Sequence, residues 1–166
     1  QVVQKKGDWQ YDDRLWLMLH SGSRAIGQAV TDRHLARAER DASGLSWFDA
    51  DSAAGTAYLR DMEWALAYAE RSRTTMIERI AELVRDRLGV AFDETSRIAC
   101  NHNHVRREVH FGEPLWVHRK GTLSARDGEA AVIPGSMGTL SFHVAGRGDE
   151  ESMCSSSHGA GRRLSR

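Results

Sequence analysis

Apolar residues recur at three- and four-residue steps over residues 58–88, and this spacing predicts the longest helix of the chain. The repeated positions are Leu59, Met62, Leu66, Ala69, Met76, Ile80 and Leu83. Gly89 follows directly and is a typical helix-ending residue. Arg73 falls on this apolar stripe, where we expect a snorkelling or ion-paired side chain rather than a charge aimed into a site.

The first part of the chain has the pattern of a strand, a turn and a helix. Residues 14–19 form a short apolar run that predicts a buried strand. The glycine-containing turn from His20 to Arg24 follows, and residues 25–40 have helical spacing. This arrangement is typical of many anion and metal sites. Residues 41–57 are rich in Gly, Asp and Ser and predict a loop.

The pattern changes after residue 95, where short segments with β character are separated by glycine and proline. The predicted strands are residues 97–100, 105–110, 115–118, 130–133 and 140–145. The chain is therefore predicted to have an α+β fold, in which a mostly antiparallel sheet core packs against one long helix.

Composition narrows the class of protein. A chain of 166 residues can form one domain with a core, and its net charge of +0 provides no global basic field for nucleic acid. Cys100 and Cys154 form no disulfide framework, which fits reduced thiols and a cytoplasmic location. No segment predicts a membrane span or a signal peptide. Because the chain begins in a predicted strand and stops in a predicted helix, we expect a piece of a longer protein.

The last residues, from Ser155 to Arg166, carry the strongest chemical signal. His158 is followed by Gly159, Ala160 and Gly161, which are small enough to let backbone N–H groups approach a ligand. Arg162 and Arg166 would share one face of a helix that starts here, and the positive end of that helix would attract an anion and keep His158 neutral. The segment predicts either a histidine that attacks a phosphate or a polar loop with a surface histidine.

Other histidines are candidate metal ligands. His102 and His104 would point to one side if their segment is a strand, and His20 stands beside a glycine turn. His104 and His110 remain open between a ligand and a hydrogen-bonded structural role. We expect the structural role for three other histidines, His34, His118 and His143.

The remaining motifs exclude some enzyme classes. The turn over residues 134–139 could hold a base or a ribose edge, or it could be a plain hairpin turn. No Walker motif, Rossmann fingerprint or Gly-x-Ser-x-Gly sequence occurs, which argues against P-loop, dinucleotide and serine-hydrolase sites.

Six blocks, taken together and in order, resemble the RtcB family, the GTP- and manganese-dependent RNA-splicing ligases. The blocks are residues 17–24, 100–104, 108–113, 117–121, 133–139 and 157–166. The resemblance implies a partial RtcB-like catalytic domain over residues 1–166, with the active site in a central cleft. It also implies that further metal ligands lie upstream and that a guanine-contacting lysine lies beyond the C-terminal end.

The resemblance assigns a role to individual residues. His158 corresponds to the histidine that takes GMP from GTP, and His20 and His102 correspond to manganese ligands. Phosphates of the nucleotide or RNA would be contacted by Asn103, Arg24, Arg162 and Arg166. The guanosine pocket would be formed by Ser136, Met137, Ser141, Ala160 and Gly161.

The implied reaction joins an RNA 3′-phosphate or 2′,3′-cyclic phosphate end to a 5′-hydroxyl end through a histidine–guanylate. The implied cofactors are Mn²⁺ and GTP. The implied partners are tRNA halves or broken RNA ends and an activating protein, with no membrane. With an incomplete metal shell, the 166 residues alone are expected not to ligate RNA and to guanylylate weakly if at all. The alternatives are a non-catalytic relative that binds metal and RNA phosphate, and a structural fragment whose histidines have no special role.

Overall fold

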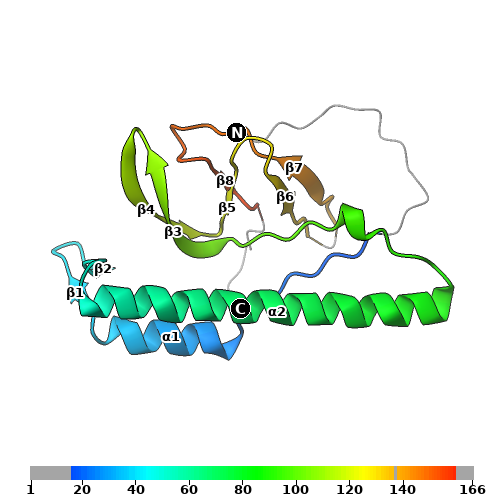
Figure 1. The fold of residues 1–166 in the computed structure, drawn as a ribbon, viewed down its shortest axis with the longest axis horizontal. Coiled ribbons are helices and arrows are strands. Elements are labelled where there is room, and N and C mark those ends of the chain that lie inside the picture. The colour runs from blue at the N-terminus through cyan, green and yellow to red at the C-terminus, as the bar shows by residue number, and fades with distance from the viewer. Residues whose placement is uncertain (1–15, 137, 160–166) are drawn as a thin grey trace. The chain divides into compact units, whose positions relative to one another are not determined.

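The computed structural model describes residues 16–136 and 138–159. The chain divides into two compact units (Figure 1). We call residues 16–92 the helical unit, and residues 93–136 and 138–159 the sheet unit. No helix in these described ranges combines the length and the apolarity that a membrane crossing requires.

Two antiparallel helices form the helical unit (Figure 1). Helix α1 spans Ala25–Leu35 and helix α2 spans Ala53–Leu88. The short strands β1 (Glu39–Arg40) and β2 (Ser46–Trp47) pair between them. Helix α2 begins where the Ser52 hydroxyl accepts the N–H of Gly55, and it ends at Gly89, whose φ of 66° is left-handed.

The helices meet through small and aromatic side chains. Ala65 and Ala69 are buried on α2, four residues apart on one helix face. His34 of α1 is 4% exposed, donates from Nε2 to the carboxylate of Asp61 at 2.9 Å, and packs edge-on against Tyr58. The structural role predicted for His34 is therefore confirmed.

The sheet unit consists of antiparallel strand pairs. A short 3₁₀ turn, η1 (Glu94–Ser96), precedes the strands. Strand β3 (Asn103–His110) pairs with β4 (Glu113–Lys120), and β6 (Ala130–Ile133) pairs with β7 (Phe142–Ala145). Strand β5 (Thr122–Ser124) pairs with β8 (Ser155–Ser157), so the end of the described chain lies beside the strand that follows β4.

The core of the sheet unit combines apolar and charged side chains. Val117, Leu123 and Ala131 are buried apolar residues. Glu108 and Arg119 are also buried, at 5% and 2% exposure. Since charged groups are rarely this buried without partners, the pair marks a specific contact.

The α+β class, the presence of both helices and the antiparallel pairing are confirmed, whereas several details were wrong. The first helix was predicted to reach residue 40, but α1 ends at Leu35 and residues 39–40 form β1. Residues 16–19 of the predicted first strand form no strand, because none of the described strand pairings includes them. Trp16 and Met18 in this segment are exposed rather than buried. Residues 97–100 likewise form no strand in the part of the chain that the structure describes. The predicted antiparallel sheet core is present in the described chain as four two-stranded sheets, β1–β2, β3–β4, β5–β8 and β6–β7. Strands β1, β2, β5 and β8 were not predicted.

Candidate functional site

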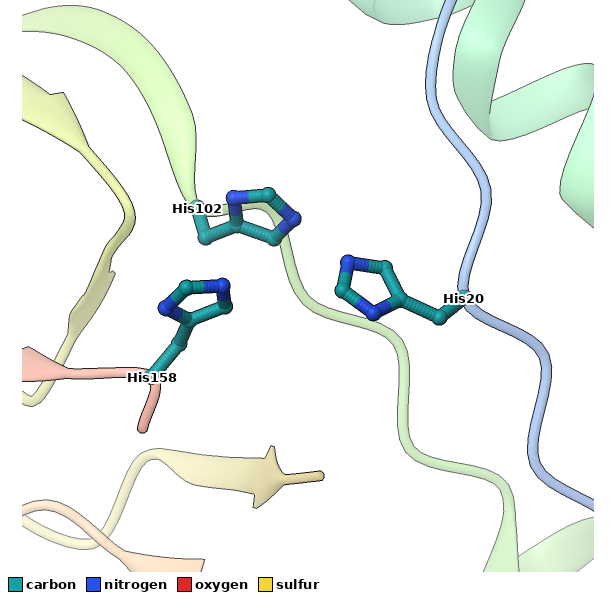
Figure 2. A group of neighbouring side chains, drawn as sticks. All are labelled: His20, His102 and His158. Carbon is teal, nitrogen blue, oxygen red and sulfur yellow. The ribbon is translucent and has the colours of Figure 1, made fainter. Parts of the chain in front are cut away.

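Two histidines from the predicted metal and nucleophile positions lie against one another in the sheet unit. The ring centroids of His102 and His158 are 4.4 Å apart, and their planes differ by 29° (Figure 2). Each ring is half-buried. His102 directly precedes β3, and His158 directly follows β8. Strand pairing therefore brings together two residues that are far apart in the sequence.

Gly121 and Thr122, which link β4 to β5, form hydrogen bonds with the backbones of both histidines, and we call these two residues the β4–β5 joint. The carbonyl of His102 accepts the N–H of Thr122 at 3.1 Å, while the N–H of His158 donates to the carbonyl of Gly121 at 3.3 Å. The N–H of Gly121 donates to Oδ1 of Asn103 at 2.8 Å. One turn of backbone thus fixes the spacing between the candidate nucleophile and the candidate metal ligand.

Gly121 suits this joint because of its backbone conformation. Its φ of 66° lies in the left-handed region that favours glycine. A Cβ at this position would meet Cε1 of His158 at 3.6 Å, an ordinary van der Waals contact, so the backbone angle and not the available space favours glycine. This glycine was recognised as part of a motif, but its role depends on the pairing of β5 with β8.

His20, the third side chain drawn in Figure 2, belongs to the helical unit and is exposed there. It lies in the turn that leads into α1. Arg73 of α2 donates from Nη1 to the carbonyl of Ser21 at 3.2 Å, which ties this turn to the long helix. Arg24 at the end of the turn is exposed and has a φ of 56°. The guanidinium of Arg73 therefore contacts the backbone beside His20.

The candidate guanosine turn is organised by hydroxyl groups. Ser141 accepts the N–H of Gly135 at 3.0 Å, and the N–H of Ser136 donates to Oγ1 of Thr139 at 2.7 Å. A pocket is lined by Ile133, Pro134, Gly135, Gly138, Thr139, Leu140, Phe142 and Gly159. Because Gly159 follows His158 directly, the pocket borders the backbone of the candidate nucleophile.

Five of the predicted site residues lie outside the described residues. They are Met137, Ala160, Gly161, Arg162 and Arg166. The helix predicted to begin near His158 also falls there, beyond the described strand β8.

The charged network in the core was missed by the sequence reasoning. Glu108 forms two hydrogen bonds with the guanidinium of Arg119, at 2.6 and 3.0 Å. The same carboxylate also accepts a hydrogen bond from Nε2 of His110 at 2.9 Å. This contact favours the structural role for His110. His104 opposes Arg119 across the β3–β4 pair, and burial lowers its pKa to about 4, so it is neutral at pH 7. The sequence signal that could have revealed this network is the pair Glu108 and His110 at alternate positions of a predicted strand, with Arg119 directly after the next predicted strand. The two sequence blocks that contain these residues, 108–113 and 117–121, had been given no role.

The pKa of Glu108 is lowered to about 2, chiefly by its hydrogen bonds to Arg119. The folded state therefore binds this proton less tightly than the unfolded state, whose ordinary value is 4.5. Stability from this group is present above pH 4.5 and is lost as the pH falls toward 2. We expect the difference in unfolding free energy between the wild type and Glu108→Gln to shrink over this window. Urea unfolding at a series of pH values measures it, and a constant difference would contradict the assignment.

Comparison with known proteins identifies the family. The sequence model of the family described as tRNA-splicing ligase RtcB matches residues 3–166. The chain belongs to the RtcB family. The RtcB resemblance carried by the six sequence blocks is therefore confirmed.

Named relatives agree with this RtcB membership. The chain is 40% identical to the RNA-splicing ligase RtcB of Escherichia coli K12 over 171 residues, which cover 93% of the chain and 41% of that relative. It is 39% identical to RNA-splicing ligase RtcB1 of Escherichia coli ATCC 25922, with the same coverage of both chains. It is 30% identical to the tRNA-splicing ligase RtcB of Pyrobaculum aerophilum, covering 90% of the chain and 38% of the relative. The chain thus spans about two-fifths of the length of these relatives.

Proposed function

We propose that this chain carries part of the catalytic site of an RNA ligase. The enzyme would join a 3′-phosphate or 2′,3′-cyclic phosphate end to a 5′-hydroxyl end, in tRNA splicing or RNA repair in the cytoplasm. Membership of the RtcB family supports this class of reaction. The observation that carries the proposal is the stacked pair of His102 and His158, held by the β4–β5 joint. Two imidazoles fixed this way suit a nucleophile beside a metal ligand.

In the proposed first step, a neutral ring nitrogen of His158 attacks the α-phosphorus of GTP. A phosphorus–nitrogen bond forms, the bond from the α-phosphorus to the bridging oxygen breaks, and pyrophosphate leaves. A 2′,3′-cyclic phosphate end is first hydrolysed: water attacks the phosphorus, the bond to the 2′-oxygen breaks, and a 3′-phosphate and a 2′-hydroxyl remain. An oxygen of the RNA 3′-phosphate then displaces His158 from the guanylate. Finally the 5′-hydroxyl attacks the activated 3′-phosphorus, so that GMP leaves and the phosphodiester bond forms. The fixed backbone of His158 reduces the freedom that the attacking atom must lose.

His20 and His102 are the proposed manganese ligands of this chain. Neutral imidazole is a common metal ligand, and the half-buried ring of His102 lies in a fixed position. Manganese also favours oxygen ligands, which the GTP phosphates would supply. When bound, the metal would neutralise phosphate charge and orient the leaving pyrophosphate.

The remaining candidates are assigned to phosphates and guanosine. Arginines present planar forks that match phosphate oxygens, and the proposed phosphate contacts are Arg24, Arg162, Arg166 and Asn103. The proposed guanosine contacts are Ser136, Met137, Ser141, Ala160 and Gly161. The proposed substrate is RNA in the form of tRNA halves or broken ends, and the reaction would be assisted by an activating protein.

The deciding experiment is labelling with α-³²P GTP and Mn²⁺, followed by a denaturing gel. The gene product that carries this sequence is compared with its His158→Ala variant. We expect the label to be retained by the wild type and lost in the variant, because the nucleophilic nitrogen is removed. His143→Ala is the matched control, since His143 is an exposed histidine on β7 and should keep the label.

Other outcomes have a defined meaning. Label that survives in His158→Ala would contradict the assigned nucleophile. If no protein is labelled but Mn²⁺ and RNA still bind, the non-catalytic relative becomes the better explanation. For the 166 residues alone, we propose little or no labelling and no ligation.

A further inference from the structure

The buried charges of the β3–β4 pair lie on the side that faces the chain segment before His158. Arg119 and Glu108 have side chains that are 1% exposed each. The two sequence blocks that contain them received no role in binding or catalysis. Their contacts therefore require a separate explanation.

Arg119 uses its guanidinium in two directions. One direction is the paired contact of Nη1 and Nη2 with the carboxylate of Glu108. In the other direction, Nε donates to Oγ of Ser155 at 3.0 Å, and Nη2 donates to the carbonyl of Met153 at 2.9 Å. Because a guanidinium is a rigid planar fork, fixing one edge on Glu108 also fixes the other. Arg119 thus connects a buried carboxylate to the turn that leads into β8.

That turn has a backbone that needs support. Met153 and Cys154 have φ values of 51° and 47°, a region that residues other than glycine seldom adopt. Such a conformation persists only where surrounding contacts determine it. Arg119 supports this turn through the carbonyl of Met153, and two backbone hydrogen bonds support it at Cys154. The carbonyl of Cys154 accepts the N–H of Ala125 at 2.7 Å, and the N–H of Cys154 donates to the carbonyl of Asp149 at 2.8 Å.

The turn decides how His158 is presented. Strand β8 begins at Ser155 and pairs in register with β5, with Ser157 opposite Thr122. A shift of one residue in this pairing would send each following side chain to the opposite face. The turn before β8 sets that register, and His158 is the next residue after the strand.

We propose that Arg119 is a positioning residue for His158, acting through Met153 and Ser155 while Glu108 holds its guanidinium in place. Arg119 touches neither nucleotide nor RNA in this role. It keeps the turn and β8 in the arrangement that stacks His158 on His102. The effect on catalysis rests on the proposed function, whereas the effect on the turn does not.

The test uses the gene product that carries this sequence and three variants. Ser155→Ala leaves the ion pair with Glu108 intact, but it removes two hydrogen bonds: the one accepted from Nε of Arg119, and the one that the Ser155 hydroxyl donates to the carbonyl of Met153 at 2.9 Å. Arg119→Lys keeps the charge and removes the fork. Ser156→Ala is the matched control, because Ser156 lies on the same strand and its hydroxyl is not bonded to Arg119.

The first measurement is hydrogen–deuterium exchange at the amides of Cys154 and His158, both of which donate backbone hydrogen bonds. We expect exchange to accelerate about tenfold or more in both test variants, tenfold being the equivalent of one lost net hydrogen bond. Arg119→Lys is the variant that reports on Arg119 alone, because Ser155→Ala also removes the bond between the Ser155 hydroxyl and Met153. Exchange in α2 and in the Ser156→Ala control should stay unchanged. Unchanged exchange in both test variants, or equal acceleration in Ser156→Ala, would overturn the proposal.

The second measurement is the rate of guanylate formation on His158 over a range of GTP concentrations. A misplaced nucleophile should lower kcat about tenfold with little change in KM, since GTP binding does not depend on the ring position. Faster exchange with an unchanged kcat would also overturn the positioning role. If the wild type itself takes no label, the proposed function has failed, and the exchange experiment still decides whether Arg119 holds the turn.

Discussion

Replacing Arg119 with methionine is expected to destabilise the sheet unit by about 3–5 kcal/mol, the range typical of a buried ion pair that loses one partner. The variant leaves the carboxylate of Glu108 buried, with its side chain 1% exposed. His110 still contacts that carboxylate at 2.9 Å, and the largely exposed Arg126 lies 3.5 Å away, so partial compensation places the effect nearer the lower limit. Hydrogen exchange of β3 and β4 peptides in urea measures the change in this unit separately.

The double variant Glu108→Leu with Arg119→Met separates the charge from the packing. Because the desolvated charges are removed together, we expect this variant to recover most of the stability lost by Arg119→Met. Arg79→Met is the surface control, since the Arg79–Glu82 pair is exposed and worth less than about 1 kcal/mol. If Arg119→Met costs no more than Arg79→Met, the ion pair does not stabilise the sheet unit as argued.

The helices were predictable because their signals are local. Apolar spacing along residues 58–88 needs no distant partner, and α2 covers that range and one further turn toward its start. Gly89 ends it in the left-handed conformation that the residue type favours. The extra turn begins at Ser52, a capping residue inside the segment interpreted as a loop. Element type was therefore more predictable than the exact boundary.

The strands were less predictable because strands depend on their partners. Residues 130–133 have enough apolar character to be recognised, and β6 has these bounds. Strand β8 is three serines, which carry no alternation of apolar and polar residues, and it exists through its pairing with β5. Conversely, the apolar residues 16–19 form no strand in the described chain.

The sequence was sufficient to predict which residues belong to the candidate site, but not how their side chains are arranged in space. Resemblance to the RtcB family selected His102 and His158, but their contact depends on backbone bonds at Gly121 and Thr122. The buried pair of Glu108 and Arg119 was missed, since charged residues in strands normally indicate a solvated face. The pair is buried where Met153 and Ser155 contact Arg119 of β4. These contacts join segments that are far apart in the sequence, so no local pattern predicts them.

Changing Asn103 to aspartate is expected to lower the ligation rate of the gene product about 100-fold or more, because a negative charge beside phosphates costs several kcal/mol. The same change should leave the fold intact. Asn103 uses Oδ1 to accept the N–H of Gly121 at 2.8 Å, and a carboxylate offers an equivalent acceptor. The melting temperature and the exchange rate of the Gly121 amide should therefore stay close to those of the wild type.

Asn103→Ala provides the contrast, because it removes the acceptor as well as the amide. We expect faster exchange at Gly121 in this variant, and a loss of guanylate formation that follows from the weakened β4–β5 joint. Measuring ligation, guanylate formation and exchange on both variants separates the two roles of one side chain. An aspartate variant as active as the wild type would show that Asn103 holds the joint and does not meet phosphate. An aspartate variant that loses both activity and exchange protection would show that the joint itself requires the amide, so that loss of ligation alone could not be assigned to phosphate contact.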